Sequence, residues 1–275
     1  MSVTHSKSAL AKIGNAQIYY EIAGQGQPLV MIHAGVADSR QWNNEFAWFT
    51  QHYRVLRYDL RGYGRSGLVE GEFRHIDDLT GLLDHLGLEG PLVLMGCSMG
   101  GGLAMDFTLA HPSRVKALIM TGSGPSGLKL DVPAPPNYAE AEKAYEARDW
   151  DLLCELETRI WFDGAGRAPD QVNPAMRRLA YEMNRIALSN EEKGLGKRLP
   201  DAASPAANRL GELDLPVLII VGVHDTPFIL AAADHMQQKI RSARKVVIQD
   251  AAHLANMDQP EEFREAVEAF LRGRK

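Results

Sequence analysis

Three residue types that together perform acyl transfer each follow an apolar run in this chain. Ser98 comes shortly after the run 92–95, Asp225 after the run 217–221, and His253 after the run 245–248. A serine hydroxyl is a weak nucleophile at neutral pH, so it needs an imidazole to accept its proton and a carboxylate to orient that imidazole. Because the carboxyl ends of parallel strands meet at one edge of a sheet, we predict that Ser98, Asp225 and His253 form a catalytic site there.

The stretch around the serine, residues 91–102, reads Pro-Leu-Val-Leu-Met-Gly-Cys-Ser-Met-Gly-Gly-Gly. Its apolar run predicts a strand buried on both faces, and residues 99–111 predict a helix. A strand that turns into a helix at one residue strains that residue, and the small Gly96 and Gly100 let the two backbones pass. This pattern is typical of a nucleophile elbow. Glycines at such a junction can also serve packing alone, so the prediction depends on the acid and the histidine found later in the chain.

Strands and helices alternate over most of the remaining sequence. The sequence predicts strands at 17–22, 29–33, 54–58, 92–95, 115–120, 217–221 and 245–248, and helices at 41–50, 76–86, 99–111, 229–240 and 262–271. The first two strands, joined by a glycine-rich turn, predict a hairpin-like opening. Repeated strand-helix units predict a mostly parallel sheet with right-handed crossovers.

Residues 122–213 interrupt this alternation with a proline-rich patch and helical segments, 140–162 and 174–188, and no convincing strand. Such a block would cover the carboxyl edge of the sheet and line a pocket there. We therefore divide the chain into a first core part, 1–124, a helical cap, 125–212, and a second core part, 213–275. The candidate substrate-binding residues are Trp161, Tyr138 and Met183 of the cap and Leu254 beside His253, although any cap aromatic can instead belong to a small satellite core.

Composition narrows the function classes. The 275 residues are 45% hydrophobic and 24% charged with a net charge of −5, as in ordinary globular enzymes, and no basic stripe indicates nucleic-acid binding. Cys97 and Cys154 form neither a disulfide framework nor a C-x-x-C pair. Residues 1–12 lack a signal-peptide core and no apolar run reaches membrane-spanning length, so we expect a cytoplasmic protein without membrane insertion. The sequence leaves the oligomeric state open, a homo-oligomer included.

In combination, five segments of the chain resemble the α/β-hydrolase superfamily. They are His33-Ala34-Gly35, residues 59–66, residues 96–101, residues 222–225 and residues 252–254 with Gln259-Pro260-Glu261 after them. The resemblance implies an α/β fold with a mostly parallel eight-stranded sheet flanked by helices and a helical cap inserted after the sixth strand.

The resemblance also implies roles for individual residues. Ser98 matches the family nucleophile, His253 the general base and acid, and Asp225 the carboxylate that orients the histidine. The amides of Met99 and Gly35 match the oxyanion hole, with Ala34 standing where glycine is usual. No metal and no organic cofactor is implied, and the expected partner is a small-molecule substrate.

Within this superfamily the chain is similar to small-molecule esterases and to 3-oxoadipate enol-lactonase-like hydrolases. The expected reaction is hydrolysis of a small carboxylic ester or lactone through an acyl-enzyme on Ser98. The alternatives are hydrolysis of a carbon–carbon bond in a diketone, cofactor-free perhydrolysis, and a non-catalytic ligand receptor. A serine rather than an aspartate at position 98 argues against the haloalkane dehalogenase and epoxide hydrolase branches.

Several other polar residues near these motifs invite a catalytic interpretation. We expect structural roles for His33, His224, Asp59 and Arg61, because each lies in a loop that shapes the fold. Asp38, beside the predicted oxyanion loop, is the one additional carboxylate that could take part in the chemistry.

Overall fold

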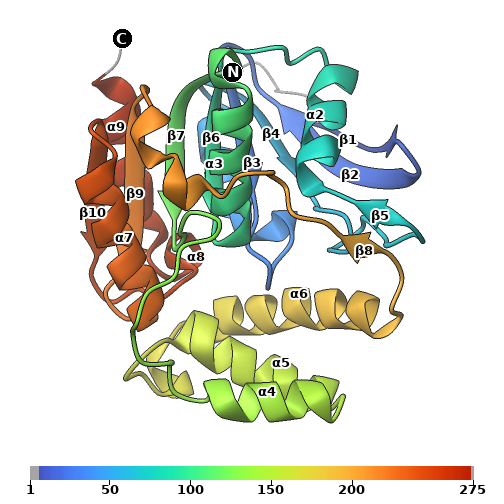
Figure 1. Ribbon diagram of the computed structural model, residues 1–275, viewed down its shortest axis with the longest axis vertical. Helices are drawn as coiled ribbons and strands as arrows, with labels where there is room; N and C mark the ends of the chain where they lie inside the picture. Colours follow the sequence, from blue (N-terminus) through green and yellow to red (C-terminus); the bar gives the residue numbers. More distant parts are fainter. Residues whose placement is uncertain (1–5, 274–275) are drawn as a thin grey trace.

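The fold of the computed structural model, which describes residues 6–273, is organised around one eight-stranded sheet with the order β1-β2-β4-β3-β6-β7-β9-β10 (Figure 1). The strands are β1 (Lys7–Ile13), β2 (Ala16–Ala23), β3 (Pro28–Ile32), β4 (Arg54–Tyr58), β6 (Leu92–Cys97), β7 (Val115–Thr121), β9 (Val217–Gly222) and β10 (Ala243–Ile248). Both pairings of β2 are antiparallel and the other five are parallel. The predicted eight-stranded, mostly parallel sheet is confirmed.

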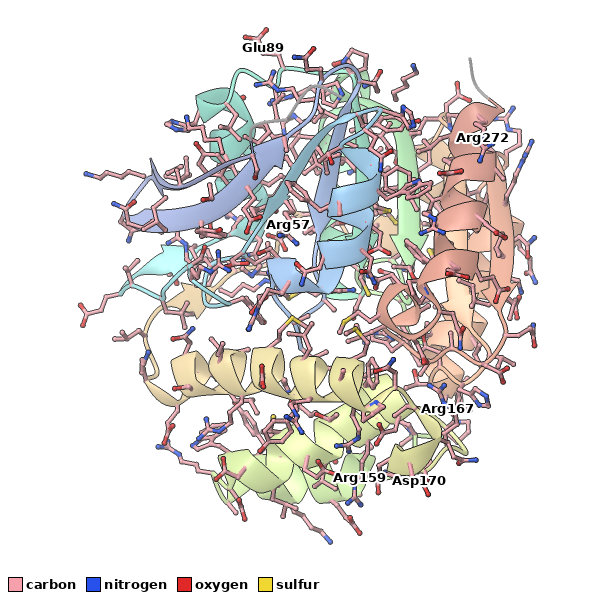
Figure 2. The ribbon with its side chains drawn as sticks, turned by 180° about the vertical axis from the view of Figure 1, so that it is seen from behind. Arg57, Glu89, Arg159, Arg167, Asp170 and Arg272 are labelled. Atoms are coloured by element: carbon pink, nitrogen blue, oxygen red, sulfur yellow. The ribbon has the colours of Figure 1, made fainter. Side chains whose placement is uncertain are left out.

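Helices cover both faces of this sheet, as its continuous apolar strands require. The helices are α1 (Asn43–Phe49), α2 (His75–His85), α3 (Met99–Ala110), α4 (Tyr138–Glu146), α5 (Trp150–Thr158), α6 (Pro174–Glu192), α7 (Pro227–Lys239), α8 (Ala255–Asp258) and α9 (Pro260–Arg272). α2, α3 and α7 lie on the front face in Figure 1, and α1 and α9 lie on the opposite face, which Figure 2 shows. Within the described residues, no helix combines the length and the apolar character needed to cross a bilayer.

The opening of the chain differs from the prediction. Strand β1 was not predicted, and it forms the hairpin with β2, whereas β3 pairs with β4 and β6. The prediction failed because β3 is buried on both faces and pairs in parallel on each side, which leaves no edge to which β2 could bind. Residues 1–5 of the segment inspected for a signal peptide lie outside the described residues.

The helical insertion follows β7, the sixth strand of the sheet, and α4 to α6 pack together beyond one edge of the sheet (Figure 1). The helical character predicted for 140–162 is confirmed, but the segment is divided: α4 ends near Arg148, whose φ of +55° is left-handed, and α5 then continues into a π-helix, Arg159–Asp163. The prediction that residues 122–213 contain no strand is wrong, because β8 (Lys197–Arg198) lies there and pairs with β5 (Glu72–Phe73). The helix predicted over 174–188 is confirmed and extends to Glu192 as α6.

A buried ion pair fastens the insertion to the core. Arg167 lies at the junction between the two in Figure 2, and its guanidinium is 2.5 Å from the Asp258 carboxylate. Its other N–H groups donate to three backbone carbonyls, those of Phe162, Asp163 and Asp250. The same Asp258 oxygen accepts the amide of Ala252, 3.0 Å away, so the contact reaches the residue before His253.

Replacing Arg167 should therefore destabilise the protein far more than replacing an exposed arginine of the insertion. We expect Arg167→Met to lower the free energy of unfolding by about 3 kcal/mol, because Asp258 is left buried without its counter-ion. Arg159→Met is the control: Arg159 pairs with Glu155 but its side chain is 47% exposed, and its loss should cost less than about 1 kcal/mol. Urea unfolding measures the stability of both variants. Equal losses would contradict the role of the Arg167–Asp258 pair in holding the insertion to the core.

Glu45 of α1 is a carboxyl group buried in the core. Its Oε2 accepts a hydrogen bond of 3.0 Å from Asn256 Nδ2 of α8. Burial raises the pKa of Glu45 to about 7, against the lowering effects of Asn256, Arg264 and Arg57. The folded protein therefore binds this proton more tightly than the unfolded chain does.

This proton gives the stability a defined pH dependence. The stabilisation is complete below the ordinary pKa of 4.5 and is lost as the pH rises through about 7. The stability of wild type relative to Glu45→Gln should fall by about 2 kcal/mol between about pH 5 and about pH 8. Urea unfolding at both pH values tests this, with Glu262→Gln on the exposed face of α9 as the control. A difference that is independent of pH would show that Glu45 does not titrate in this range.

Candidate active site

Ser98 stands at a strained turn between β6 and α3. Its φ of +51° and ψ of −117° lie in a region that side chains rarely adopt. Two contacts hold it there: the Ser98 amide donates to Thr121 O at 2.9 Å, and Ser123 Oγ donates to Ser98 O at 2.7 Å. The turn leaves the serine half-buried at the start of the helix, as an elbow requires.

Two glycines make this turn sterically feasible. A methyl group at Gly96 would lie 2.3 Å from Gly100 O, and one at Gly100 would lie 2.4 Å from Ile32 O. No side chain fits at either position without moving the backbone. The predicted close passage of α3 past the strands is therefore present.

His253 and Asp225 form a buried pair. His253 Nδ1 lies 3.0 Å from Asp225 Oδ1 and 3.1 Å from Oδ2, and both residues are at most 2% exposed. Because the Asp225 carboxylate accepts this hydrogen bond, Nδ1 carries the ring proton, and Nε2 is the nitrogen that can accept a proton from another group. Asp225 Oδ1 is fixed in turn by the Thr226 amide at 2.7 Å.

Close contacts to backbone oxygens bring the loops after β6, β7, β9 and β10 together. Cys97 Sγ donates to His253 O at 3.8 Å, and a methyl group at Gly122 would lie 2.6 Å from the same oxygen. The amide of His224 donates to Ala251 O at 2.9 Å, which joins the acid loop to the histidine loop. Ser98, Asp225 and His253 thus lie at the same edge of the sheet, as predicted.

The loop after β3 lies against the serine turn. A methyl group at Gly35 would be 3.7 Å from the Met99 side chain, so the two predicted oxyanion residues are neighbours. The Ala34 amide donates to Gln41 Oε1 at 2.9 Å and is thereby occupied. Within residues 6–273, no acceptor is bonded to the Gly35 or the Met99 amide.

Two of the four predicted substrate-binding residues, Trp161 and Leu254, lie near this site. The ring of Trp161, on the π-helix, is 4.7 Å from the His253 ring between centroids. Leu254 and Trp161 line one small cavity of about 10 Å³, and Met183 is buried in the apolar cluster that contains Leu254. Tyr138 is 41% exposed at the start of α4, and no contact of it with Ser98 or His253 is present in the described part of the chain.

Polar residues that sequence reasoning missed also face the site. Glu157 and Asn184 line the cavity beside Trp161, with Asn184 Nδ2 donating to Glu157 Oε2 at 2.8 Å. Burial raises the pKa of Glu157, and Glu191 adds to this effect against the hydrogen bond from Asn184. No motif marks either residue in the sequence, because they come from two different helices of the insertion.

A second cavity, of about 240 Å³, reaches Ser98 from the side of α7 and β8. Arg198 lines it, lies against Met99 Sδ and pairs with Asp201 at 2.7 Å. Arg198 was not predicted either, since the strand that carries it is two residues long.

His33 and His224 have the structural roles that we expected. His33 Nδ1 donates to Ala34 O at 2.7 Å, and its Nε2 accepts from the Leu60 amide at 2.9 Å. Burial lowers the pKa of His33, so the ring stays neutral and holds the loop. His224 Nδ1 donates to Ala165 O of the insertion at 2.9 Å.

The acidic residues of the neighbouring turns are also engaged. Asp38 caps a short helix and pairs with Arg40 at 2.6 Å; Arg40 lowers the pKa of Asp38 although burial alone would raise it. The Asp59 carboxylate accepts two backbone amides, and Arg61 pairs with Asp78 at 2.5 Å. Residues 6–273 contain no group of three or more His, Cys, Asp or Glu side chains placed to bind a metal.

Comparison with known proteins shows that the chain is similar to hydrolases. The chain is 27% identical to a pimeloyl-[acyl-carrier protein] methyl ester esterase of Nitrosospira multiformis, over 94% of this chain and 100% of that protein. It is 28% identical to a 2-hydroxy-6-oxononadienedioate/2-hydroxy-6-oxononatrienedioate hydrolase of Paraburkholderia xenovorans, over 94% and 91%. The crystal structure of the enol-lactonase from Burkholderia xenovorans has the same fold, with a TM-score of 0.77 and 22% identity over 96% of this chain and 100% of that one.

A family model is matched by most of the chain. It is described as alpha/beta hydrolase fold and covers residues 27–260, from the start of β3 to the start of α9. The matched segment contains the serine turn, the acid loop, the histidine loop and the whole insertion. With the strand order and the shared edge described above, this match shows that the chain belongs to the alpha/beta hydrolase fold family.

Proposed function

We propose that this protein hydrolyses a small carboxylic ester or lactone through an acyl-enzyme on Ser98. The observation that carries the proposal is the buried Asp225–His253 pair beside the strained serine turn. We assign it to the cytoplasm, which its two buried, unpaired cysteines favour. Residues 125–212 act as the cap that selects the substrate.

In the proposed reaction, Ser98 Oγ attacks the carbonyl carbon while His253 Nε2 takes the hydroxyl proton. The imidazolium is stabilised by Asp225 and returns that proton to the leaving oxygen, which departs as an alcohol. Water then attacks the acyl group, His253 takes its proton, and the acid is released as Ser98 is restored.

Two backbone amides would stabilise the negative charge on the carbonyl oxygen. Met99 and Gly35 fit this role, because their amides have no acceptor within the described residues and the Ala34 amide is already bonded to Gln41. Loss of one such donor typically raises the barrier by about 3 kcal/mol.

The surroundings of the histidine favour a small substrate. Trp161 packs on the His253 ring, and the cavity beside it is about the size of one water molecule. The larger space on the side of Arg198 can take the other half of the substrate. We therefore expect short acyl groups to be preferred.

Hydrolysis of a carbon–carbon bond in a diketone is the second candidate. The identity to the oxononadienedioate hydrolase, 28%, equals that to the methyl ester esterase within one percentage point. The same serine and histidine serve both reactions. Faster cleavage of a vinylogous diketone than of any ester would favour this candidate, and cleavage of esters alone would favour the first.

Replacing Ser98 is the direct test. Ser98→Ala should lower kcat for p-nitrophenyl acetate by at least about 10³-fold, because the nucleophile is lost. Ser242→Ala, at an exposed loop position, is the control and should leave kcat unchanged. A fluorophosphonate should label wild type and the control at Ser98 but not Ser98→Ala. Full turnover by Ser98→Ala would remove this serine from the mechanism.

Enlarging the space beside the histidine should change the preference for chain length. Trp161→Ala should raise the ratio of kcat/KM for hexanoate over acetate esters by about tenfold or more, since the cavity can then hold additional methylene groups. Trp150→Ala removes a tryptophan that packs on Tyr145 instead, and should leave the ratio unchanged. An unchanged ratio in both variants would show that Trp161 does not limit the acyl group.

A further inference from the structure

One buried side chain, that of Gln41, joins the loop after β3 to the histidine loop. Its Oε1 accepts the Ala34 amide at 2.9 Å, and its Nε2 donates to Asn256 Oδ1 at 3.1 Å. Gln41 is 2% exposed and Asn256 is completely buried. The two residues are 215 positions apart in the chain.

Asn256 completes the link from α8, three residues after His253. Its Nδ2 donates both to Gln41 O at 2.9 Å and to Glu45 Oε2 at 3.0 Å. Every polar atom of its amide thus has a partner, which fixes its orientation. The Cys97 thiol, next to Ser98, donates to His253 O at 3.8 Å.

The bond to Ala34 decides which amide remains available. Gln41 Oε1 accepts the Ala34 amide, so that amide cannot bind another acceptor. The next amide, that of Gly35, carries no such bond among the described residues and belongs to a loop that contacts Met99. The bonds to Asn256 hold the segment that starts at His253. One pair of amide side chains therefore constrains both the proposed oxyanion donor and the proposed base.

We propose that Gln41 and Asn256 are positioning residues that set the Gly35 amide and the His253 imidazole relative to each other for catalysis. This inference rests on the proposed function of the site. A displacement of about 1 Å between reacting groups can lower a rate by about 100-fold, so such a link can control kcat without touching the substrate. Because oxyanion donors act in the transition state, the effect should fall on kcat and leave KM nearly unchanged.

Gln41→Met keeps the side-chain length and removes both side-chain hydrogen bonds, to the Ala34 amide and to Asn256 Oδ1. We expect kcat for p-nitrophenyl acetate to fall between about 10- and 100-fold, with KM changed less than about twofold. A trifluoromethyl ketone, which forms a tetrahedral adduct, should bind more weakly by the same factor, whereas acetate, the product, should bind as it does to wild type. The control is Thr108→Val in α3, which removes a buried bond to Ala104 O and should lower stability alone.

Two further measurements keep the inference open to refutation. Asn256→Leu should give the same pattern. The kcat of the double variant should be no lower than that of the less active single variant, because both residues act through one link. Hydrogen exchange should rise in peptides containing residues 33–36 and 253–256 of Gln41→Met, and not in Thr108→Val. This readout does not require activity.

The outcomes separate the two proposals. If wild type turns over esters and Gln41→Met keeps full kcat, or if the losses in the double variant are additive, the positioning role is wrong while the serine mechanism stands. The positioning role is also wrong if hydrogen exchange in Gln41→Met is the same as in wild type. If wild type has no hydrolase activity, the proposed function fails, and the positioning role for catalysis fails with it.

Discussion

The close passage of helix α3 across strands β3 and β6 is the constraint on which the rest of the site depends. It requires glycine at 96 and 100, because a side chain at either would overlap backbone oxygens. It also forces Ser98 into a strained conformation with positive φ, which the bonds to Thr121 and Ser123 must hold. This turn also restricts the positions of the loops after the neighbouring strands β3 and β7, since both loops pack on it.

The acid and histidine loops are packed as closely. A methyl group at Gly222 would lie 2.3 Å from Ala251 O, so the loop after β9 and the loop after β10 share one narrow space. The insertion contacts both: Ala165 exchanges two hydrogen bonds with His224, and Arg167 pairs with Asp258. The π-helix between α5 and these contacts carries Trp161 onto the histidine ring. Such helices recur at functional sites because one additional residue per turn redirects a side chain.

The sequence could predict what local patterns encode. Ser98, Asp225 and His253 were predictable because each follows a buried strand, and strand ends converge in an α/β sheet. Strand β1 was not, because it lies at the edge of the sheet with Leu10 exposed and therefore lacks a clear apolar pattern. The break at Arg148 was missed because no glycine marks its left-handed backbone. The contact of Gln41 with Asn256 links residues too far apart for any local pattern to predict.

The two-residue strand β8, paired with β5, closes the helical insertion on one side (Figure 1), and Arg167 lies on the other side (Figure 2). The insertion is thus tethered at two separated points, one near the histidine loop and one before α2. A chimera that exchanges this block with that of a relative must keep both tethers, with Arg167 matched to Asp258 and residues 197–198 matched to 72–73. The natural unit of exchange between such hydrolases is therefore the insertion together with the core residues that hold it.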